Sequence, residues 1–281
     1  FSVKPEKDQK VYIEKSLVSV LEQKRAQQKK RYSVSSIAMA MRLFKPRGDV
    51  VMLGAPRNEV GQRANEFLRN VKMNRAFYLA EHEITEKQYQ RIVRKGKTSN
   101  LPVTNLTWIE AIRFCNELSK REGLTPYYTI RGKGVVFLKN SDGYRLPSES
   151  EWEWASRKYK KRVPTIYSWG NRNKIPPGAG NIADESAKGI TKSFVARYND
   201  NHAGISPVKS FSAEKNGLFD MFGNVSEWVG DYYSLNPYDS KKIYEDLVNS
   251  HPSKSNVIKG ASWKSGTVTE LRASYREGLI G

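Results

Sequence analysis

Two stretches of the chain carry most of the information about its fold: residues 144–155 read YRLPSESEWEWA, and residues 217–228 read GLFDMFGNVSEW. Ser148 in the first stretch is followed three residues later by Glu151, a capping-box spacing that predicts the start of a helix. Each stretch places several residue types at set positions, so together they are far more specific than a lone glycine motif. They therefore indicate one defined fold rather than a general composition class.

Short elements separated by turns lie upstream of these two stretches. Residues 76–80 are typical of a strand, and Thr85 with Gln88 three residues later predicts the first turn of a helix. Residues 126–130 and 134–138 favour the two strands of a hairpin, because both are short runs rich in aromatic and β-branched side chains. The pattern as a whole predicts a mixture of small helices and strands.

The region from residue 159 to residue 202 shows little periodicity, and Gly, Asn, Pro and Asp recur in it. The 20 Gly and 12 Pro of the chain are scattered rather than gathered in runs, which is typical of a loop-rich fold. An irregular stretch of this length is uncommon in a compact domain unless something orders it. A bound metal ion would do so.

The clearest expected helix begins after Thr107 and ends at Gly123. One face of this helix is apolar at helical spacing, and it consists of Trp108, Ala111, Ile112, Cys115 and Leu118. The chain has 1 cysteine, which excludes an internal disulfide and a paired-cysteine metal site. We interpret Cys115 as a buried core thiol rather than a nucleophile, because a free cysteine on an apolar face packs as a small hydrophobe.

The first 45 residues differ in composition from the rest of the chain. They contain a basic run made of Lys24, Arg25, Lys29, Lys30 and Arg31. Residues 16–21 are apolar enough for a strand or the start of a helix, and residues 22–31 favour a helix by propensity. We expect a basic N-terminal extension over residues 1–45, which packs on or links to a main domain over residues 46–281. Charge runs of this kind are more often solvated helix faces than binding sites.

The net charge is +19, from 48 basic and 29 acidic residues. Such a charge attracts polyanions, including anionic surfaces, but it is equally consistent with a solvated surface that keeps the protein soluble. Zinc-finger spacing, heptads and RNP-type aromatic runs are absent from the sequence, so nucleic acid is an unlikely partner. No apolar window reaches the roughly 18 residues of a membrane span. The chain begins at Phe1, and we interpret it as a mature or truncated product.

The order of motifs along the chain resembles the formylglycine-generating-enzyme (sulfatase-modifying-factor) family. The matching segments are residues 77–85 with Tyr89, residues 103–111, residues 114–116, residues 144–155, Trp169-Gly170, residues 217–228 and residues 260–263. They cover roughly residues 46–281. The resemblance implies an α+β, loop-rich fold of the C-type-lectin-like kind with little regular secondary structure.

The same resemblance implies calcium, at one or two sites. At the first site, the side chains of Asp220 and Glu227 and the backbone carbonyls of Gly223 and Val225 would bind the ion. At the second site, the ligands would be the side chains of Asn181 and Asp200 and the carbonyls of Ile182 and His202. Oxygen-only ligands suit a hard cation of this size, whereas the imidazole of His202 does not. The alternative is that Asp220 and Glu227 are turn and cap acids.

The resemblance breaks at the catalytic centre. The family's enzymes hold copper with two cysteines, and in this chain those positions fall at Ser265 and Glu270. Cu(I) prefers soft thiolates, so neither residue substitutes for them. His82, His202 and His251 are too scattered for the iron site of a second enzyme branch. We expect no copper, no iron and no catalytic residues.

These observations predict a non-catalytic, calcium-stabilised binding or scaffold domain of a periplasmic or surface assembly. Its partner would be a protein or a glycan, bound in a basic aromatic groove formed by Trp263, Arg272, Tyr275 and Arg276. Two alternatives stay open: an enzyme of the same type with altered chemistry, and a polyanion-binding protein. The supply of calcium outside the bacterial cytoplasm favours a periplasmic or extracellular location.

Overall fold

The computed structural model describes residues 29–132, 134–235 and 238–280. The elements in chain order are β1 (Arg31–Val34), the 3-10 helix η1 (Ser35–Ile37), β2 (Met39–Phe44), β3 (Asp49–Leu53), β4 (Arg69–Met73), β5 (Phe77–Ala80), α2 (Glu86–Val93), α3 (Trp108–Arg121), β6 (Tyr128–Arg131), β7 (Gly134–Phe137), α4 (Glu149–Arg157), η2 (Glu185–Ala187), β8 (Glu227–Tyr232), β9 (Ile243–Glu245), β10 (Asn256–Lys259), α5 (Val268–Leu271) and β11 (Arg276–Leu279). No helix in this described part is long and apolar enough to cross a membrane.

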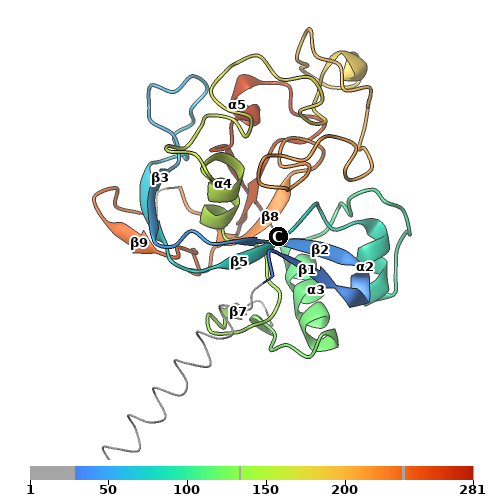
Figure 1. Cartoon of the computed structure of the whole chain (residues 1–281), viewed down its shortest axis with the longest axis vertical. Helices are drawn as coiled ribbons and strands as arrows, with labels where there is room; N and C mark the ends of the chain where they lie inside the picture. The colour runs from blue at the N-terminus through green and yellow to red at the C-terminus, as the bar shows by residue number, and fades with distance from the viewer. Residues whose placement is uncertain (1–28, 133, 236–237, 281) are drawn as a thin grey trace, which may run out of the picture.

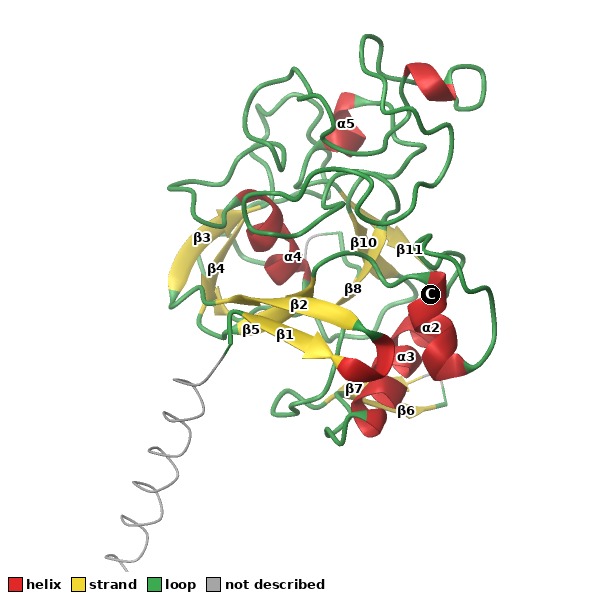
Figure 2. Cartoon of the chain, turned by 45° about the vertical axis from the view of Figure 1, so that its right-hand side comes forward, coloured by secondary structure: helices red, strands yellow, loops and turns green. Residues whose placement is uncertain are grey.

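The described strands form four small sheets, with the orders β1-β2-β5, β11-β10-β8, β3-β4-β9 and β6-β7. The neighbouring strands pair antiparallel, except that β9 pairs parallel with β4. These sheets, with α2 and α3, occupy the lower part of the molecule in Figure 2, and long loops with α5 make up its upper part. The expected loop-rich α+β fold is confirmed.

The expected boundary at residue 45 is wrong, because residues 31–44 belong to the domain. Strand β2 pairs with β5 in register from Met41 with Ala80 to Phe44 with Phe77. Val34, Ile37 and Met39 are buried against α3, and Phe44 is buried in a second core. Pairing and burial of these apolar residues therefore tie the segment to the main domain (Figure 1). Residues 16–21, Lys24 and Arg25 lie outside the described residues. The helix expected over residues 22–31 also begins there.

The helices begin where the sequence places them. Thr85, Thr107 and Ser148 each accept a hydrogen bond from the backbone N–H three residues on, which completes the capping boxes of α2, α3 and α4. These bonds satisfy N–H groups that have no partner within the helix. The apolar face of α3 is buried as expected, and Gly123 follows the helix with a positive φ of 72°.

Helix α4 carries three acidic residues into the interior of the protein. Glu153 is fully buried and forms ion pairs with Arg69 at 2.9 Å and Lys259 at 3.4 Å. Glu151 lies on the opposite side of the helix, where it pairs with Arg145. Buried carboxylates persist when cations and donors compensate their lost hydration. Helix α4 therefore contributes a compensated cluster of charges to the core that contains Phe44.

Candidate functional site

The first expected calcium site is a tight loop that leads into β8. Asp220, Gly223 and Asn224 have φ angles of 57°, 89° and 59°, in the left-handed region that favours glycine. A Cβ atom on Gly223 would overlap the backbone of Asn181. The backbone N–H of Asn224 donates to the carbonyl of Asn181 at 2.6 Å. The two expected calcium loops therefore pack directly on each other.

Several oxygen atoms in the first loop have no hydrogen-bond partner within the described part of the chain. Asp220 is buried, and its Oδ2 accepts the backbone N–H of Lys209 at 2.8 Å, but its Oδ1 accepts nothing. The carbonyl oxygens of Gly223 and Val225 accept no hydrogen bond either. A buried carboxylate oxygen beside two free carbonyls is the donor set that a hard cation takes. The residues of this loop thus fit calcium.

Glu83 joins this loop from the connection between β5 and α2, and the sequence reasoning missed it. Its Oε1 accepts from Asn224 Nδ2 at 3.3 Å, and its Oε2 is buried without a partner. Burial raises the pKa of Glu83 well above its usual range, and the charges of Asp220 and Glu227 raise it further. Burial likewise raises the pKa of Glu227 to about 7. The signals in the sequence were the position of Glu83 in the family-matching segment 77–85 and just before a helix cap.

The second expected site has a mixed set of oxygen atoms. Asn181 is fully buried, and its Oδ1 has no partner among the described residues. The carbonyl oxygens of Ile182 and His202 accept no hydrogen bond in that same part of the chain. Asp200, however, accepts the backbone N–H of Ile182 at 2.9 Å and that of His202 at 2.8 Å. Asp200 therefore already acts as a turn acid, and Asn181 is the stronger candidate for a ligand.

Neither expected calcium site could be formed by carboxylate side chains alone. Among the residues that the structure describes, no group of three or more His, Cys, Asp or Glu side chains is placed to hold a metal ion. Any calcium ion at these loops must therefore take backbone and amide oxygens as well, as the resemblance implied. Calcium sites in proteins use such carbonyl ligands routinely.

Three of the four residues expected to line a partner groove are instead buried inside the protein. The Arg272 guanidinium binds Glu66 at 2.6 Å, Glu59 at 3.0 Å and the carbonyl of Gly61 at 2.6 Å. Its side chain is 0% exposed. This prediction is wrong for Arg272, because the acids that enclose its guanidinium are distant in sequence and only folding brings them together.

Arg276 and Tyr275 are corrected for the same reason. Arg276 is buried, and its guanidinium binds Glu149 at 2.8 and 3.1 Å and the carbonyl of Asn65 at 3.1 Å. Tyr275 is buried, and its hydroxyl donates to Glu277 at 2.7 Å. Trp263 differs, since it is only half-buried and the Lys264 ammonium lies 5.0 Å from its ring centroid. Of the four, Trp263 alone is available to a partner.

The two positions that replace the copper cysteines have local structural roles. Ser265 is buried, and its Oγ accepts the backbone N–H of Ser262 at 3.0 Å. Glu270 closes the capping box of α5 with Thr267. Cys115 lies in another core, on α3, where burial raises the pKa of its thiol to about 12. A thiol with that pKa is protonated at neutral pH and is a poor metal ligand.

The fold and the loops together define a loop-rich α+β domain of the formylglycine-generating-enzyme type in which both copper-cysteine positions lack a thiol. Residues 38–279 match the model of the sulfatase-modifying factor enzyme 1-like domain family, and the chain belongs to this family. The family assignment drawn from the motifs is therefore confirmed.

Individual relatives include proteins with quite different names. The chaperone protein LppX of Paenibacillus barcinonensis is 30% identical over 219 residues, which cover 71% of this chain and 73% of that protein. The inactive C-alpha-formylglycine-generating enzyme 2 of Mus musculus is 34% identical over 165 residues, covering 58% of this chain and 38% of the mouse protein. Variable protein 1 of Treponema denticola has the same fold, with a TM-score of 0.66 at 22% identity over 89% of this chain and 93% of that one.

Proposed function

We propose that this protein is a non-catalytic, calcium-stabilised domain that works as a binding or scaffold module in a periplasmic or surface assembly. The observation that carries the proposal is the pair Ser265 and Glu270 at the positions of the copper cysteines. Both side chains are used in hydrogen bonds that stabilise their own loop. Neither offers the thiolate that Cu(I) chemistry needs.

The unpaired oxygen atoms of the two packed loops support the calcium part of the proposal. Asp220, Glu227 and the carbonyls of Gly223 and Val225 would hold one ion, and Glu83 lies next to them. Asn181 would contribute to a second ion. When bound, calcium would neutralise carboxylates whose burial is otherwise costly. The chemistry supplied by the ion is thus structural, and it would hold the loops that follow α4 in place.

The relatives support the binding part of the proposal. One relative is named an inactive formylglycine-generating enzyme and another a chaperone, so the fold occurs in proteins named for roles other than that catalysis. A protein or glycan partner would contact the half-buried Trp263 and the exposed Lys264, because aromatic rings and cations bind both kinds of ligand. Calcium is abundant outside the bacterial cytoplasm, which favours a periplasmic or extracellular setting.

An activity assay tests the non-catalytic assignment. We expect the purified protein, incubated with Cu(I) and a cysteine-containing sulfatase-motif peptide, to leave the peptide unchanged by mass spectrometry. A formylglycine-generating enzyme in the same buffer serves as the positive control. A product peptide in which the cysteine side chain has become an aldehyde, with its sulfur lost and one oxygen gained, would show that the protein is an enzyme and that our assignment is wrong.

A further inference from the structure

The outer edge of β6 exposes backbone hydrogen-bonding groups. Strand β6 pairs only with β7 in the described residues, in a register that sets Tyr128 opposite Phe137 and Ile130 opposite Val135. The carbonyl of Tyr127 accepts the N–H of Leu138 at 2.8 Å, so Tyr127 faces β7. Because the direction of the backbone groups alternates along a strand, the N–H and C=O groups of Tyr128 and Ile130 point away from β7.

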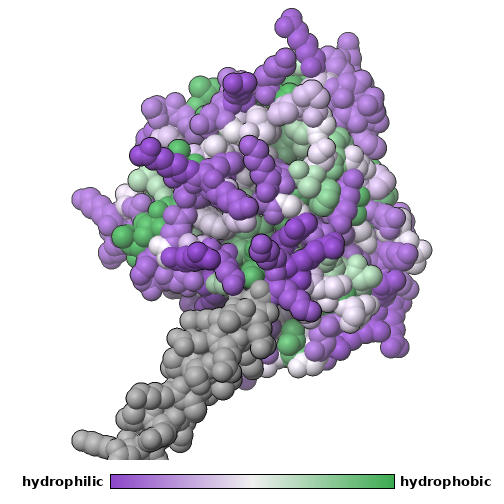
Figure 3. Space-filling model, in the orientation of Figure 1, coloured by the Kyte–Doolittle hydropathy of each residue, from purple (hydrophilic) through white to green (hydrophobic). Residues whose placement is uncertain are grey.

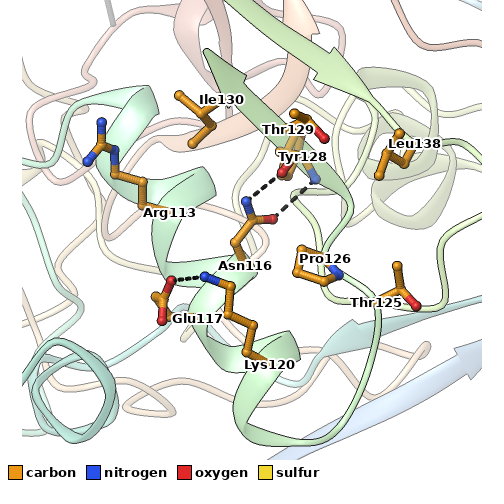
Figure 4. A pocket seen from close by; sticks show the side chains of 10 residues that line it. All are labelled: Arg113, Asn116, Glu117, Lys120, Thr125, Pro126, Tyr128, Thr129, Ile130 and Leu138. Atoms are coloured by element: carbon orange, nitrogen blue, oxygen red, sulfur yellow. Dashed lines mark hydrogen bonds and ion pairs between the residues drawn. The ribbon is translucent and has the colours of Figure 1, made fainter. Parts of the chain in front are cut away.

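At one of these two positions, Tyr128, the side chain of Asn116 on α3 forms the backbone hydrogen bonds that a neighbouring strand would form. Its side-chain amide donates to the carbonyl of Tyr128 at 2.7 Å and accepts the N–H of Tyr128 at 3.1 Å (Figure 4). Ile130 lies two residues further along the same edge. Outside its own ladder, its backbone groups have no hydrogen-bond partner within the described chain. The edge is thus half occupied, and its next position is open.

An open groove of about 490 Å³ runs between this edge and the outer face of α3. The helix contributes Arg113, Asn116, Glu117 and Lys120, and the hairpin side contributes Ile130 and Leu138 among others (Figure 4). Leu138 is 41% exposed, so the groove offers apolar as well as polar surface. A groove bordered by an unpaired strand edge and apolar side chains suits an extended peptide, which pairs through its main chain and places alternate side chains in the groove.

The charges of the groove indicate what kind of peptide it fits. Lys120 is neutralised by Glu117, whose Oε1 lies 2.7 Å from its Nζ. Arg113 is exposed and forms no ion pair with any described residue. The remaining charge is therefore positive, in a protein whose net charge is +19. Complementary charge favours an acidic side chain on the bound segment.

We propose that the groove between α3 and β6 binds an extended acidic peptide segment of a partner protein, which pairs with Ile130 and places a carboxylate against Arg113. This groove is a second contact surface, separate from the one around Trp263 and Lys264, and the inference rests on the proposed binding function. The hairpin lies at the end of the molecule opposite α5 in both Figure 1 and Figure 2. Variants in the groove therefore leave the region of the former copper positions untouched.

An array of octapeptides with glutamate at alternate positions is the probe, and fluorescence anisotropy measures the affinity of its best member. We expect Arg113→Glu to weaken that binding at least tenfold without changing the melting temperature. The matched control is Lys87→Glu, an exposed charge on α2, which should bind as wild type does. Replacing the glutamates of the peptide by glutamine should also weaken binding, because the carboxylate is then lost.

Backbone pairing is tested separately by N-methylation of the peptide. Methylating one set of alternate residues should abolish binding and methylating the other set should not, because only one set faces β6. Amide hydrogen exchange at Ile130 should slow when the peptide binds.

The proposal is overturned if no array member binds more tightly than about 1 mM, or if both methylated sets bind equally. It is also overturned if the free protein is a dimer that Arg113→Glu dissociates, since a second copy would then occupy the edge. None of these outcomes depends on the formylglycine assay.

Discussion

At the scale of single residues, several charged side chains are buried and bound by more than one partner inside the protein. Arg276 meets Glu149, two backbone carbonyls and the rings of Phe67 and Tyr233. A buried guanidinium that uses four of its five N–H donors inside the protein has a structural role rather than a role in binding a partner. From the sequence alone, Arg272 and Arg276 are residue types typical of binding surfaces. Their surroundings in the folded protein show a structural role.

Replacing Arg276 by alanine should lower the free energy of unfolding by about 3–5 kcal/mol, because Glu149 would stay buried without that cation. Urea denaturation measures the change. The control is Arg63→Ala, whose ion pair with Glu277 is long at 3.8 Å and exposed, and which should cost less than about 1 kcal/mol. A stable Arg276→Ala protein that has lost partner binding would instead restore Arg276 as a contact residue.

Glu81 predicts a pH dependence. Its buried carboxylate pairs with Arg31 at 2.7 Å, Arg42 at 2.8 Å and Lys209 at 3.3 Å. The hydrogen bond from Arg31 holds the pKa of Glu81 at about 2, below its usual 4.5. Because the pKa is lowered on folding, this stabilisation is complete above pH 4.5 and is lost as the pH falls towards 2.

Thermal melts of wild type and Glu81→Gln at several pH values test this dependence. The melting temperature of the variant should lie well below that of wild type at pH 7, and the gap should close between about pH 4.5 and pH 2. Glu117→Gln, at an exposed ion pair, is the control and should change little at any pH. A gap that is constant down to pH 2 would mean that the charge of Glu81 is not what stabilises the fold.

At the scale of elements, the helices are defined locally and the loops are not. Each of α2, α3 and α4 begins with a capping box that the sequence shows in full. The loops around Asn181 and Gly223 have no such local signal, and their conformation depends on their contact with each other. Helix starts are therefore predictable from a few neighbouring residues, whereas the loop conformations are not.

The cap of α3 can be tested alone. Thr107→Ala removes the acceptor for the N–H of Glu110, and it should lower the free energy of unfolding by about 1 kcal/mol. Thr107→Ser keeps the hydroxyl and should be close to wild type. Urea denaturation of the three proteins measures the difference. Equal losses for both substitutions would show that the threonine methyl group, rather than the cap, supplies the stability.

At the scale of the whole molecule, one part consists mainly of sheets and helices, and the part that contains α5 consists largely of loops (Figure 2). The surface shown in Figure 3 is mostly hydrophilic, with small and separate apolar patches. Among the described residues, the loops around Asn181 and Gly223 pack on a small hydrophobic cluster that contains Tyr167, Ile182 and Phe222. Calcium bound at these loops would therefore stabilise this part of the molecule.

Calcium should therefore raise the melting temperature of the whole domain, and EDTA should lower it. An ion that binds only the folded state contributes about 2.7 kcal/mol at 100 times its dissociation constant. Glu227→Gln should remove most of the calcium effect. Glu245→Gln, an exposed residue paired with Lys72, is the control and should keep it. A melting curve that responds to neither calcium nor EDTA would contradict the proposed site.

The family, the helix starts, the buried face of α3 and the lack of thiols at the copper positions could all be predicted from the amino-acid sequence. These features depend on local spacing or on residue identity, which a linear pattern records. Three features became visible only in the folded protein: residues 31–44 belong to the domain, Arg272 and Arg276 are internal, and Glu83 lies near Asp220 and Glu227. Each of these depends on partners roughly 30 to 210 positions away, because electrostatic and packing energies depend on distance in space and not along the chain.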